Sequence, residues 1–268
     1  MMLSASLARV LLLATCVALC SAQLPWTTRT KVGTCSIGCD FYREEDGTLT
    51  KTLAGARSSC VCTSLELRRL NLTAVAHDTF AGLNALTSLD LYGNLLIFPP
   101  SLTGLTRLQS LVLWDNLLIA PPTLVGLASL KYLDLDGNKL PYPPTLAGLT
   151  ALEILYLNNN LLASPPVLTG LRSLQYLYLS GNSLTDSPTL TGLTALKQLS
   201  LSNNALTSPP TLTGLTALQF LSMDGNALNS PPTTAGLPAL KHLQVSSKLA
   251  CSTCSSLSDD LSASVRNP

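Results

Sequence analysis

The stretch that decides the fold is Leu-Gln-Ser-Leu-Val-Leu-Trp-Asp-Asn-Leu-Leu, residues 108–118. Leu111 and Leu113 stand two apart, which is the spacing at which a β-strand presents two side chains to one face. The residues that alternate with these leucines must then face the other side of the strand, and they are Ser110, Val112 and Trp114. Two adjacent prolines follow at 121–122. Because proline has no N–H to donate, they predict polyproline-like or turn backbone, so the unit is a short strand, a turn and an irregular return limb.

The same unit recurs every 22 residues along the middle of the chain. The leucines that open it are Leu86, Leu108, Leu130, Leu152, Leu174, Leu196, Leu218 and Leu240. Asparagines, glycines and prolines keep the same step. A fixed period of roughly 20–50 residues predicts a solenoid, in which stacked coils bury leucines that one coil alone would expose. The strands should therefore form one parallel sheet, and the repeated Asn amide should pair with backbone groups that the turn leaves unsatisfied.

The pattern Leu-x-x-Leu-x-Leu-x-x-Asn-x-Leu resembles the leucine-rich-repeat family over about residues 65–250. The 22-residue length is similar to the repeat class of internalins. This resemblance implies an α/β-type solenoid, a right-handed curved horseshoe with a parallel sheet on its concave face and polyproline or turn return limbs on its convex face. It also implies a non-catalytic module that recognises a ligand, usually a protein, through the concave face. The first coil has Leu70 where the pattern has Asn, as a terminal capping coil would.

The composition changes along the chain and divides it into four predicted parts. Residues 1–22 read as a secretory signal peptide, because an apolar stretch after Arg9 ends at the small residues Ser21-Ala22. An uncleaved anchor is the rival interpretation. A cysteine-containing cap follows at 23–63, about nine repeat coils at 64–248, and a short C-terminal cap and tail at 249–268. The predicted location is extracellular, with no membrane insertion after removal of the signal.

Six cysteines remain after residue 22, at the two ends of the repeats: Cys35, Cys39, Cys60, Cys62, Cys251 and Cys254. An even number in a secreted chain favours disulfides. We predict that the first two pair across with Cys60 and Cys62, since strand geometry would aim those two side chains the same way at an awkward separation. A zinc site is the rival interpretation of these four, and a redox motif that of the C-terminal pair. Asn71-Leu-Thr is the one predicted N-glycosylation site in the mature chain.

Charge and composition exclude several classes of function. Only 12% of residues are charged and the net charge is +1, so nothing favours nucleic acid or an anionic membrane as partner. The two histidines, His77 and His242, are too far apart in the repeats to act together. Asp134 and Asp136 share one strand face, where paired carboxylates could bind calcium or hydrolyse glycosides, but solvated side chains are the simpler interpretation. We predict no enzyme activity, no cofactor and no metal.

The strand positions that face away from the leucines form three columns on the sheet. They hold aromatic and acidic residues, without Lys or Arg, and these crowd the earlier coils while the later coils are mostly Ser. Exposed Tyr and Trp recur as binding hot spots, although aromatic residues also suit strands for purely structural reasons. The predicted ligand-binding residues are Tyr92, Trp114, Tyr132, Asp134, Asp136, Tyr156, Tyr176 and Tyr178. Because Asp90, Asp134 and Asp136 have no basic neighbour in the columns, a neutral or basic partner is expected.

Three functions fit these observations. A protein ligand on the concave face is the leading hypothesis. Carbohydrate or cell-wall binding is the second, because Tyr and Trp beside Asp also suit sugar rings and hydroxyls. A structural matrix protein that assembles through its Thr- and Pro-rich return limbs is the third.

Overall fold

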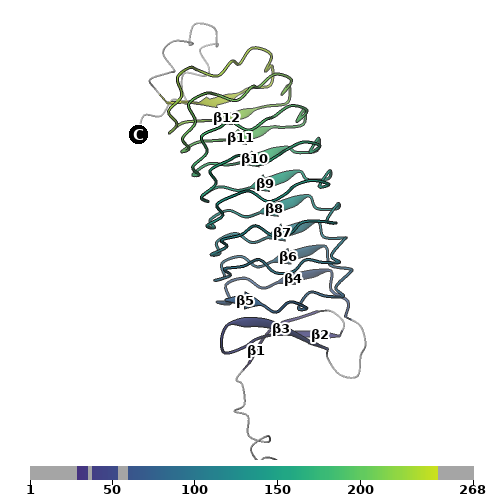
Figure 1. Ribbon diagram of the computed structural model, residues 1–268. Coiled ribbons are helices and arrows are strands. Elements are labelled where there is room, and N and C mark those ends of the chain that lie inside the picture. Colours follow the sequence, from purple (N-terminus) through teal and green to yellow (C-terminus); the bar gives the residue numbers. More distant parts are fainter. Residues whose placement is uncertain (1–28, 36–37, 54–59, 247–268) are drawn as a thin grey trace, which may run out of the picture.

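The computed structural model describes residues 29–35, 38–53 and 60–246 and forms a solenoid of stacked coils (Figure 1). One strand from each coil joins a nine-stranded sheet in the order β13-β12-β11-β10-β9-β8-β7-β6-β4. All neighbours are parallel, and the register steps by one coil, so that Leu155 lies beside Leu133 and Leu177. The strands are β4 (Ser64–Glu66), β6 (Ser88–Asp90), β7 (Ser110–Val112), β8 (Tyr132–Asp134), β9 (Ile154–Tyr156), β10 (Tyr176–Tyr178), β11 (Gln198–Ser200), β12 (Phe220–Ser222) and β13 (His242–Gln244).

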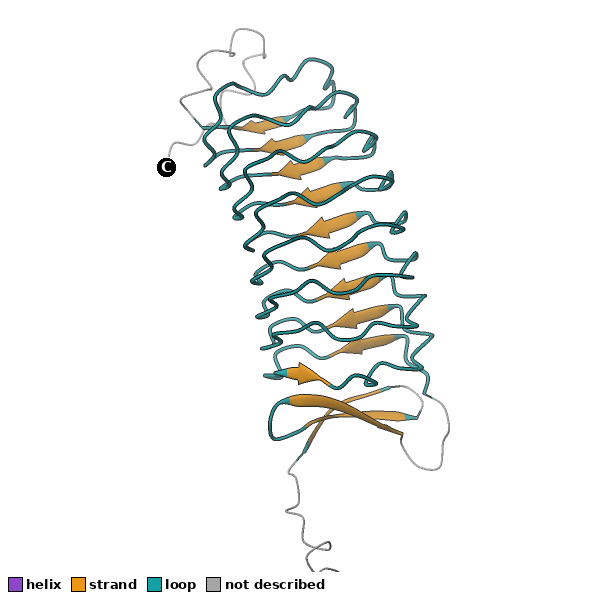
Figure 2. Cartoon of the chain, viewed as in Figure 1, coloured by secondary structure: helices purple, strands orange, loops and turns teal. Residues whose placement is uncertain are grey.

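The return limbs consist of turns and extended backbone, and no helix occurs in the described ranges (Figure 2). The leucine-rich-repeat solenoid is therefore as expected, but the α/β part of the expected fold class is not seen there. The paired prolines are the physical reason, because they cannot supply the N–H groups that a helix in the limb would need. After the prolines the chain bends back through a glycine with positive φ, such as Gly126 at 83°, a conformation that other residues rarely adopt.

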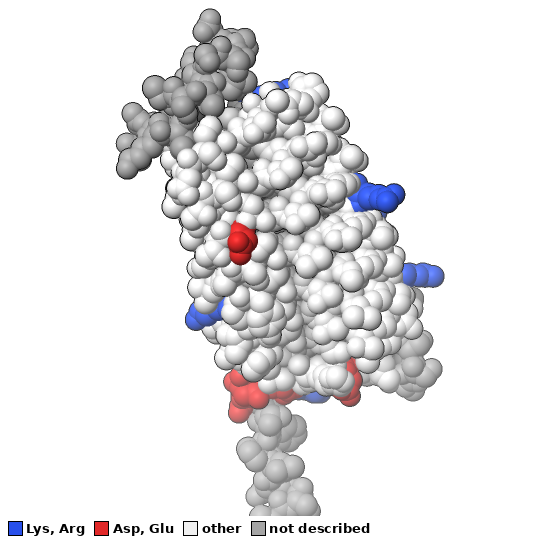
Figure 3. Space-filling model, turned by 45° about the horizontal axis from the view of Figure 1, so that its top comes forward, with Lys and Arg blue, Asp and Glu red and all other residues white. Residues whose placement is uncertain are grey.

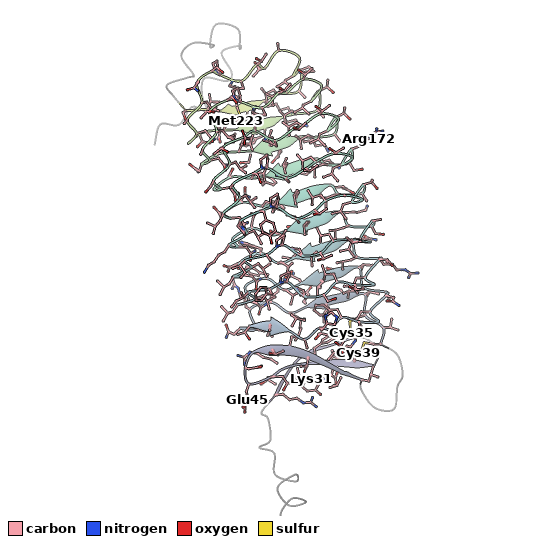
Figure 4. The ribbon with its side chains drawn as sticks, in the orientation of Figure 1. Lys31, Cys35, Cys39, Glu45, Arg172 and Met223 are labelled. Atoms are coloured by element: carbon pink, nitrogen blue, oxygen red, sulfur yellow. A yellow bond between two sulfur atoms is a disulfide. The ribbon has the colours of Figure 1, made fainter. Side chains whose placement is uncertain are left out.

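Leucines fill the interior of the solenoid. Leu155 and Leu157 on the strand side and Leu162 beyond the turn are fully buried, and the corresponding leucines of neighbouring coils are too. Each such side chain contributes roughly 1.5–3 kcal/mol when it leaves water, which no isolated coil could obtain. In the coil of β12 a methionine, Met223, takes the place of one leucine and is equally buried (Figure 4). Its unbranched side chain adapts to the same space.

The repeated asparagines form a ladder inside the stack. The Oδ1 atom of Asn160 accepts the N–H of Leu140 at 3.1 Å, and its Nδ2 donates to the carbonyl of Leu135 at 3.0 Å, both in the preceding coil. Nδ2 also donates to the carbonyls of Leu157 and Asn158 in its own coil. Equivalent bonds connect the other repeat asparagines, from Asn94 to Asn226. The structural role expected for these residues is confirmed.

Replacing Asn160 with alanine is expected to lower the free energy of unfolding by roughly 1–3 kcal/mol, because buried backbone groups in two coils lose their partner. Chemical denaturation of the parent and the variant measures this. Asn229→Ala is the control, because the Asn229 side chain is exposed on a return limb and its backbone is not in the left-handed region. An Asn160→Ala variant as stable as the parent would refute the ladder as a source of stability.

A small antiparallel sheet covers the first coil. Its strands are β1 (Thr30–Thr34), β2 (Cys39–Arg43) and β3 (Thr48–Leu53), and β5 (Ala74–Val75) of the first coil pairs in parallel with β3. Phe41 and Leu49 point from this cap into the core and are fully buried. The sheet was not expected, although Asp46-Gly47 and the alternation after it carry a hairpin signal. The cap removes from water the leucines that an open first coil would expose.

Two disulfides tie the cap to the first coil. Cys35 bonds to Cys62 and Cys39 to Cys60, so the predicted cross-pairing is confirmed. Figure 4 shows Cys35 and Cys39 close together where the cap meets the coils. Because all four thiols are consumed, they are not free for the rival zinc site. The predicted signal peptide, residues 1–22, and the C-terminal pair Cys251 and Cys254 lie outside the described residues, as does the 249–268 segment.

Candidate ligand-binding face

Three columns of side chains cross the sheet on the side away from the leucine core. In-register pairing places Tyr132, Ile154 and Tyr176 in the first column and Asp134, Tyr156 and Tyr178 in the second. The third column follows the strand ends, where backbone bonds such as Leu91 N–H to Val112 and Gly93 N–H to Trp114 continue the parallel pairing. The predicted residues therefore do share one face. Their exposure differs, from 45% for Trp114 to 7% for Asp134.

The aromatic residues of the earlier coils form two groups on this face. Tyr92 and Trp114 stack with ring centroids 4.5 Å apart. Tyr156 stacks on Tyr178 at 4.6 Å with nearly parallel rings, and Tyr132 meets Tyr156 at 5.7 Å with tilted rings. Cross-strand stacking holds each ring at a fixed position, so little side-chain entropy remains to be lost when a ligand binds. These contacts confirm the pairings expected from the register.

The first coil supplies two arginines to this face, which corrects the expectation that Asp90 has no basic neighbour. The Nε atom of Arg68 donates to Oδ2 of Asp90 at 2.7 Å. Arg69 lies over the Tyr92 ring, 4.9 Å from its centroid, and donates to its hydroxyl. The prediction missed them because both precede the regular 22-residue register, as the first coil is longer than the others. Asp90 is thereby neutralised by the chain itself.

Asp134 and Asp136 are not simply solvated, which corrects the simpler interpretation of this pair. Oδ1 of Asp134 accepts the N–H of Asp136 at 3.1 Å, and its Oδ2 accepts the Tyr132 hydroxyl at 3.1 Å. Asp136 accepts the backbone N–H of Asn158 at 2.5 Å and its side-chain amide at 2.9 Å. Neighbouring side chains cover both carboxylates, because the strands lie only about 4.8 Å apart. Asn158, absent from the predicted set, is therefore part of the site.

Burial dominates the proton affinity of these groups. Removal from water, with a smaller contribution from the neighbouring Asp134, raises the pKa of Asp136 to about 7 against the opposing effect of the Asn158 hydrogen bonds. Burial likewise raises the pKa of Asp134. The pKa values of Tyr132, Tyr156 and Tyr178 are also raised, first by burial, and then by Asp134 for the first two and by the neighbouring tyrosines for Tyr178. The acids therefore lie in a drier environment than ordinary surface carboxylates.

The raised pKa of Asp136 predicts that stability falls as pH rises. The folded-state pKa of about 7 exceeds the ordinary aspartate pKa of 3.8, so the contribution of Asp136 to stability is present below about pH 4 and is lost as pH rises through 7. We expect the free energy of unfolding of Asp136→Asn, relative to that of the parent, to be about 1–4 kcal/mol higher at about pH 8 than at about pH 4. Denaturant unfolding at the two pH values measures the difference, with Asp186→Asn as control. An unchanged difference would show that Asp136 titrates normally.

Neither alternative chemistry of the acidic pair gains support from the geometry. The described residues contain no group of three or more His, Cys, Asp or Glu side chains able to hold a metal ion. His77 follows β5 in the first coil and His242 lies on the last strand, so the structure does not bring them together. No helix within the described ranges has the length and apolar character needed to cross a bilayer.

The later coils carry a hydroxyl network instead of isolated serines. Ser202 and Ser222 are both buried and contact each other, and each donates to Asp224. Ser180 and Ser200 lie 2.6 Å apart between their hydroxyl oxygens. These side chains satisfy one another and stabilise the sheet. They are therefore unsuitable as neutral control positions for binding.

The return limbs form a second surface with little charge. Most of the exposed large apolar side chains lie there, including Phe98, Val125, Tyr142 and Val167, which are 52–81% exposed. Figure 3 shows a face of the solenoid on which charged side chains are sparse and mostly at the edges. Tyr142 supplies an aromatic control for the sheet face, because it belongs to the same coils but projects from the limb.

The predicted glycosylation site lies at the first turn of the solenoid. The side chain of Asn71 is exposed and its backbone φ of 52° marks a turn. We expect expression through a eukaryotic secretory pathway to add a glycan there, visible as a mobility change on glycosidase treatment. Asn71→Asp, which tolerates positive φ, is the control and should lack the change. A parent protein with unaltered mobility would contradict this prediction.

Comparisons with known proteins agree with the geometry. The leucine rich repeat family model matches residues 62–118 and 143–184, a two-copy model of leucine rich repeats matches 172–214, and a single-repeat model matches 129–149. The repeats of this chain are leucine-rich repeats. The search of curated proteins gives no match.

Solved structures share this fold. A leucine-rich-repeat protein of Leptospira interrogans is 33% identical over 68% of this chain and 48% of its own, with a TM-score of 0.63. Internalin C2 of Listeria monocytogenes is 28% identical over 69% of this chain and 80% of its own, with a TM-score of 0.60. A chain from the octameric complex of latrophilin 3, Unc5D and FLRT2 is 26% identical over 68% and 60%, with a TM-score of 0.58. The chain spans about half the length of the Leptospira protein.

Proposed function

We propose that this chain is a secreted, non-catalytic recognition module that binds a protein partner through the sheet face from β6 to β10. The observation that carries the proposal is the pair of stacked aromatic groups around Trp114 and Tyr156 on that face. Aromatic rings held in place by their neighbours supply large contact area at small entropic cost. Solenoids commonly present such an extended face to protein ligands, and the FLRT2 relative comes from a multiprotein complex.

The two disulfides support the extracellular part of the proposal, because such bonds persist in oxidising compartments. The predicted signal peptide points the same way. The sheet face takes precedence over the return limbs because it combines aromatic groups with fixed hydrogen-bonding acceptors. An interface of that kind distinguishes between partners.

Affinity capture tests this proposal. The parent protein and a Trp114→Ala/Tyr156→Ala variant are immobilised and exposed to extracellular material from the source organism. Proteins retained by the parent and by Tyr142→Ala, but lost from the double variant, are expected. Equal retention by all three proteins would place binding elsewhere.

Carbohydrate binding is the second candidate, and the observation in its favour is the Tyr156–Tyr178 stack beside Asp134 and Asp136. Flat rings suit sugar faces and carboxylates accept sugar hydroxyls. A glycan array separates the candidates. Binding to one class of glycan, lost in Tyr156→Ala, would favour this alternative over a protein partner.

A further inference from the structure

The three acids among the aromatic coils differ in how their charge is met. Arg68 pairs with Asp90, as described above, with a nitrogen–oxygen distance of 2.7 Å. Asp134 and Asp136 receive hydrogen bonds from Tyr132, Asn158 and the backbone, and no ion pair reaches either one within the described part of the chain. Two close carboxylates in the aromatic coils therefore remain without a cation, whereas the third acid there, Asp90, has one.

Asp90 shows which kind of group a carboxylate binds on this face. Asp90 and Asp134 occupy the same column, and each uses Oδ1 to accept the N–H of the residue two further on. At Asp90 the other oxygen, Oδ2, accepts a guanidinium N–H from Arg68 of the preceding coil. At Asp134 the corresponding residue of the preceding coil is Trp114, which carries no charge. The guanidinium of Arg68 thus lies beside Asp90, whereas the corresponding residue beside Asp134 is an aromatic ring.

A second contact shows that the aromatic rings of this face also accept guanidinium groups. Arg69 lies over the ring of Tyr92 and bonds to its hydroxyl. Beside Asp134 stand Tyr132, which contacts it through its hydroxyl, and Tyr156, its in-register neighbour. Planar guanidinium groups stack on such rings while they donate to carboxylates, which a compact ammonium group does less well.

We propose that Trp114, Tyr132, Asp134, Asp136 and Tyr156 form a site for an arginine side chain of the protein partner. This inference rests on the proposed function and specifies the chemistry of its centre. The Oδ2 atom of Asp134 accepts one hydrogen bond and has capacity for another, in the way that Oδ2 of Asp90 serves Arg68. Asp136 adds a second negative charge within the same coil. The flanking rings exclude water and strengthen the charge-assisted bonds.

The site requires ionised carboxylates, so binding should depend on pH. The groups that interact with the Asp136 side chain are Asp134 and Tyr132 on its own coil, Asn158 and Tyr156 on the next, and Tyr178 on the one beyond. None of these is a cation. Binding of a guanidinium should therefore strengthen between about pH 5.5 and pH 8, as Asp136 loses its proton.

Titration with a short arginine peptide tests the site, with the isosteric citrulline peptide as neutral probe. Isothermal calorimetry at low salt should show binding of the arginine peptide only. The Asp134→Asn/Asp136→Asn variant should lose roughly tenfold or more in affinity, because charge-assisted hydrogen bonds are lost. Asp186→Asn removes the same type of charge from an exposed return limb and should bind like the parent.

The inference would be overturned if the parent bound both peptides equally, or did not bind the arginine peptide at pH 8. It would also be overturned if the double variant and Asp186→Asn lost affinity equally. The pH dependence of the unaltered parent gives an independent answer should the double variant fold poorly. A captured protein partner that depends on Trp114 but not on the two acids would refute the arginine site alone. Arginine binding without any partner at this face would refute the proposed function alone.

Discussion

Leu155→Ala is expected to lower the free energy of unfolding by about 2–5 kcal/mol, the largest stability change among the substitutions considered. Leu155 is fully buried at the centre of β9 and lies in register between Leu133 and Leu177. Its truncation removes apolar contact on both sides and leaves a cavity that the stacked coils cannot close, since each is held by the Asn ladder. Denaturant unfolding of the parent and the variant gives the value.

Leu161→Ala provides the matched control, because Leu161 belongs to the same coil but its side chain is exposed. Its effect should stay within about 0.5 kcal/mol. Similar losses at the two positions would mean that the leucine core is not the main source of stability in the middle of the solenoid.

Trp114→Ala and Tyr156→Ala are expected to weaken binding of the captured partner by about 2 kcal/mol or more each, roughly thirtyfold in affinity. Both rings are held by stacking against a neighbour and neither enters the leucine core. The folded protein should therefore survive both changes with a modest loss, while the ligand loses a preorganised anchor. Surface plasmon resonance of the purified variants measures the dissociation constants.

Tyr142→Ala removes an exposed aromatic ring of the same coils from the return limb and should bind like the parent. Tyr176→Ala is informative in a different way, because Tyr176 lies in the first column, separated from Tyr132 by Ile154. It should weaken binding less than Tyr156→Ala. Parent-like affinity of both Trp114→Ala and Tyr156→Ala would leave the aromatic groups with a structural role only.

The repeat made most of the fold predictable. Because the period is strictly 22 residues, the assignment of Leu111 and Leu113 to the core applies to every coil after the first and predicts eight of the nine parallel strands, β6 to β13. The buried Asn follows from the same logic, since every turn leaves the same backbone groups unpaired. The cap could not be derived in this way. It occurs once, and its β2–β3 hairpin depends on the single Asp46-Gly47 turn.

The candidate site was predictable in position but not in electrostatics. Strand parity placed Tyr92, Trp114 and Tyr156 on the sheet face, and the register placed their rings side by side. The charge pairing and hydrogen bonding of the site depend on how far individual side chains extend. Arg68 of the first coil reaches Asp90 in another column, a contact that column membership does not give, and the Asn158 side chain turns toward its column neighbour Asp136. The burial of Asp134 similarly depends on how large neighbours lie across it.

Hydroxyl-radical footprinting of the chain with its captured partner tests the central claim most directly, because it locates the covered surface without altering any residue. Aromatic side chains report well, and they stand on both surfaces. The predicted result is protection of Trp114, Tyr132, Tyr156 and Tyr178 on the sheet face, with Phe98 and Tyr142 on the return limbs labelled as in the free protein. Protection of Phe98 and Tyr142, with the sheet-face aromatics labelled as before, would contradict the account.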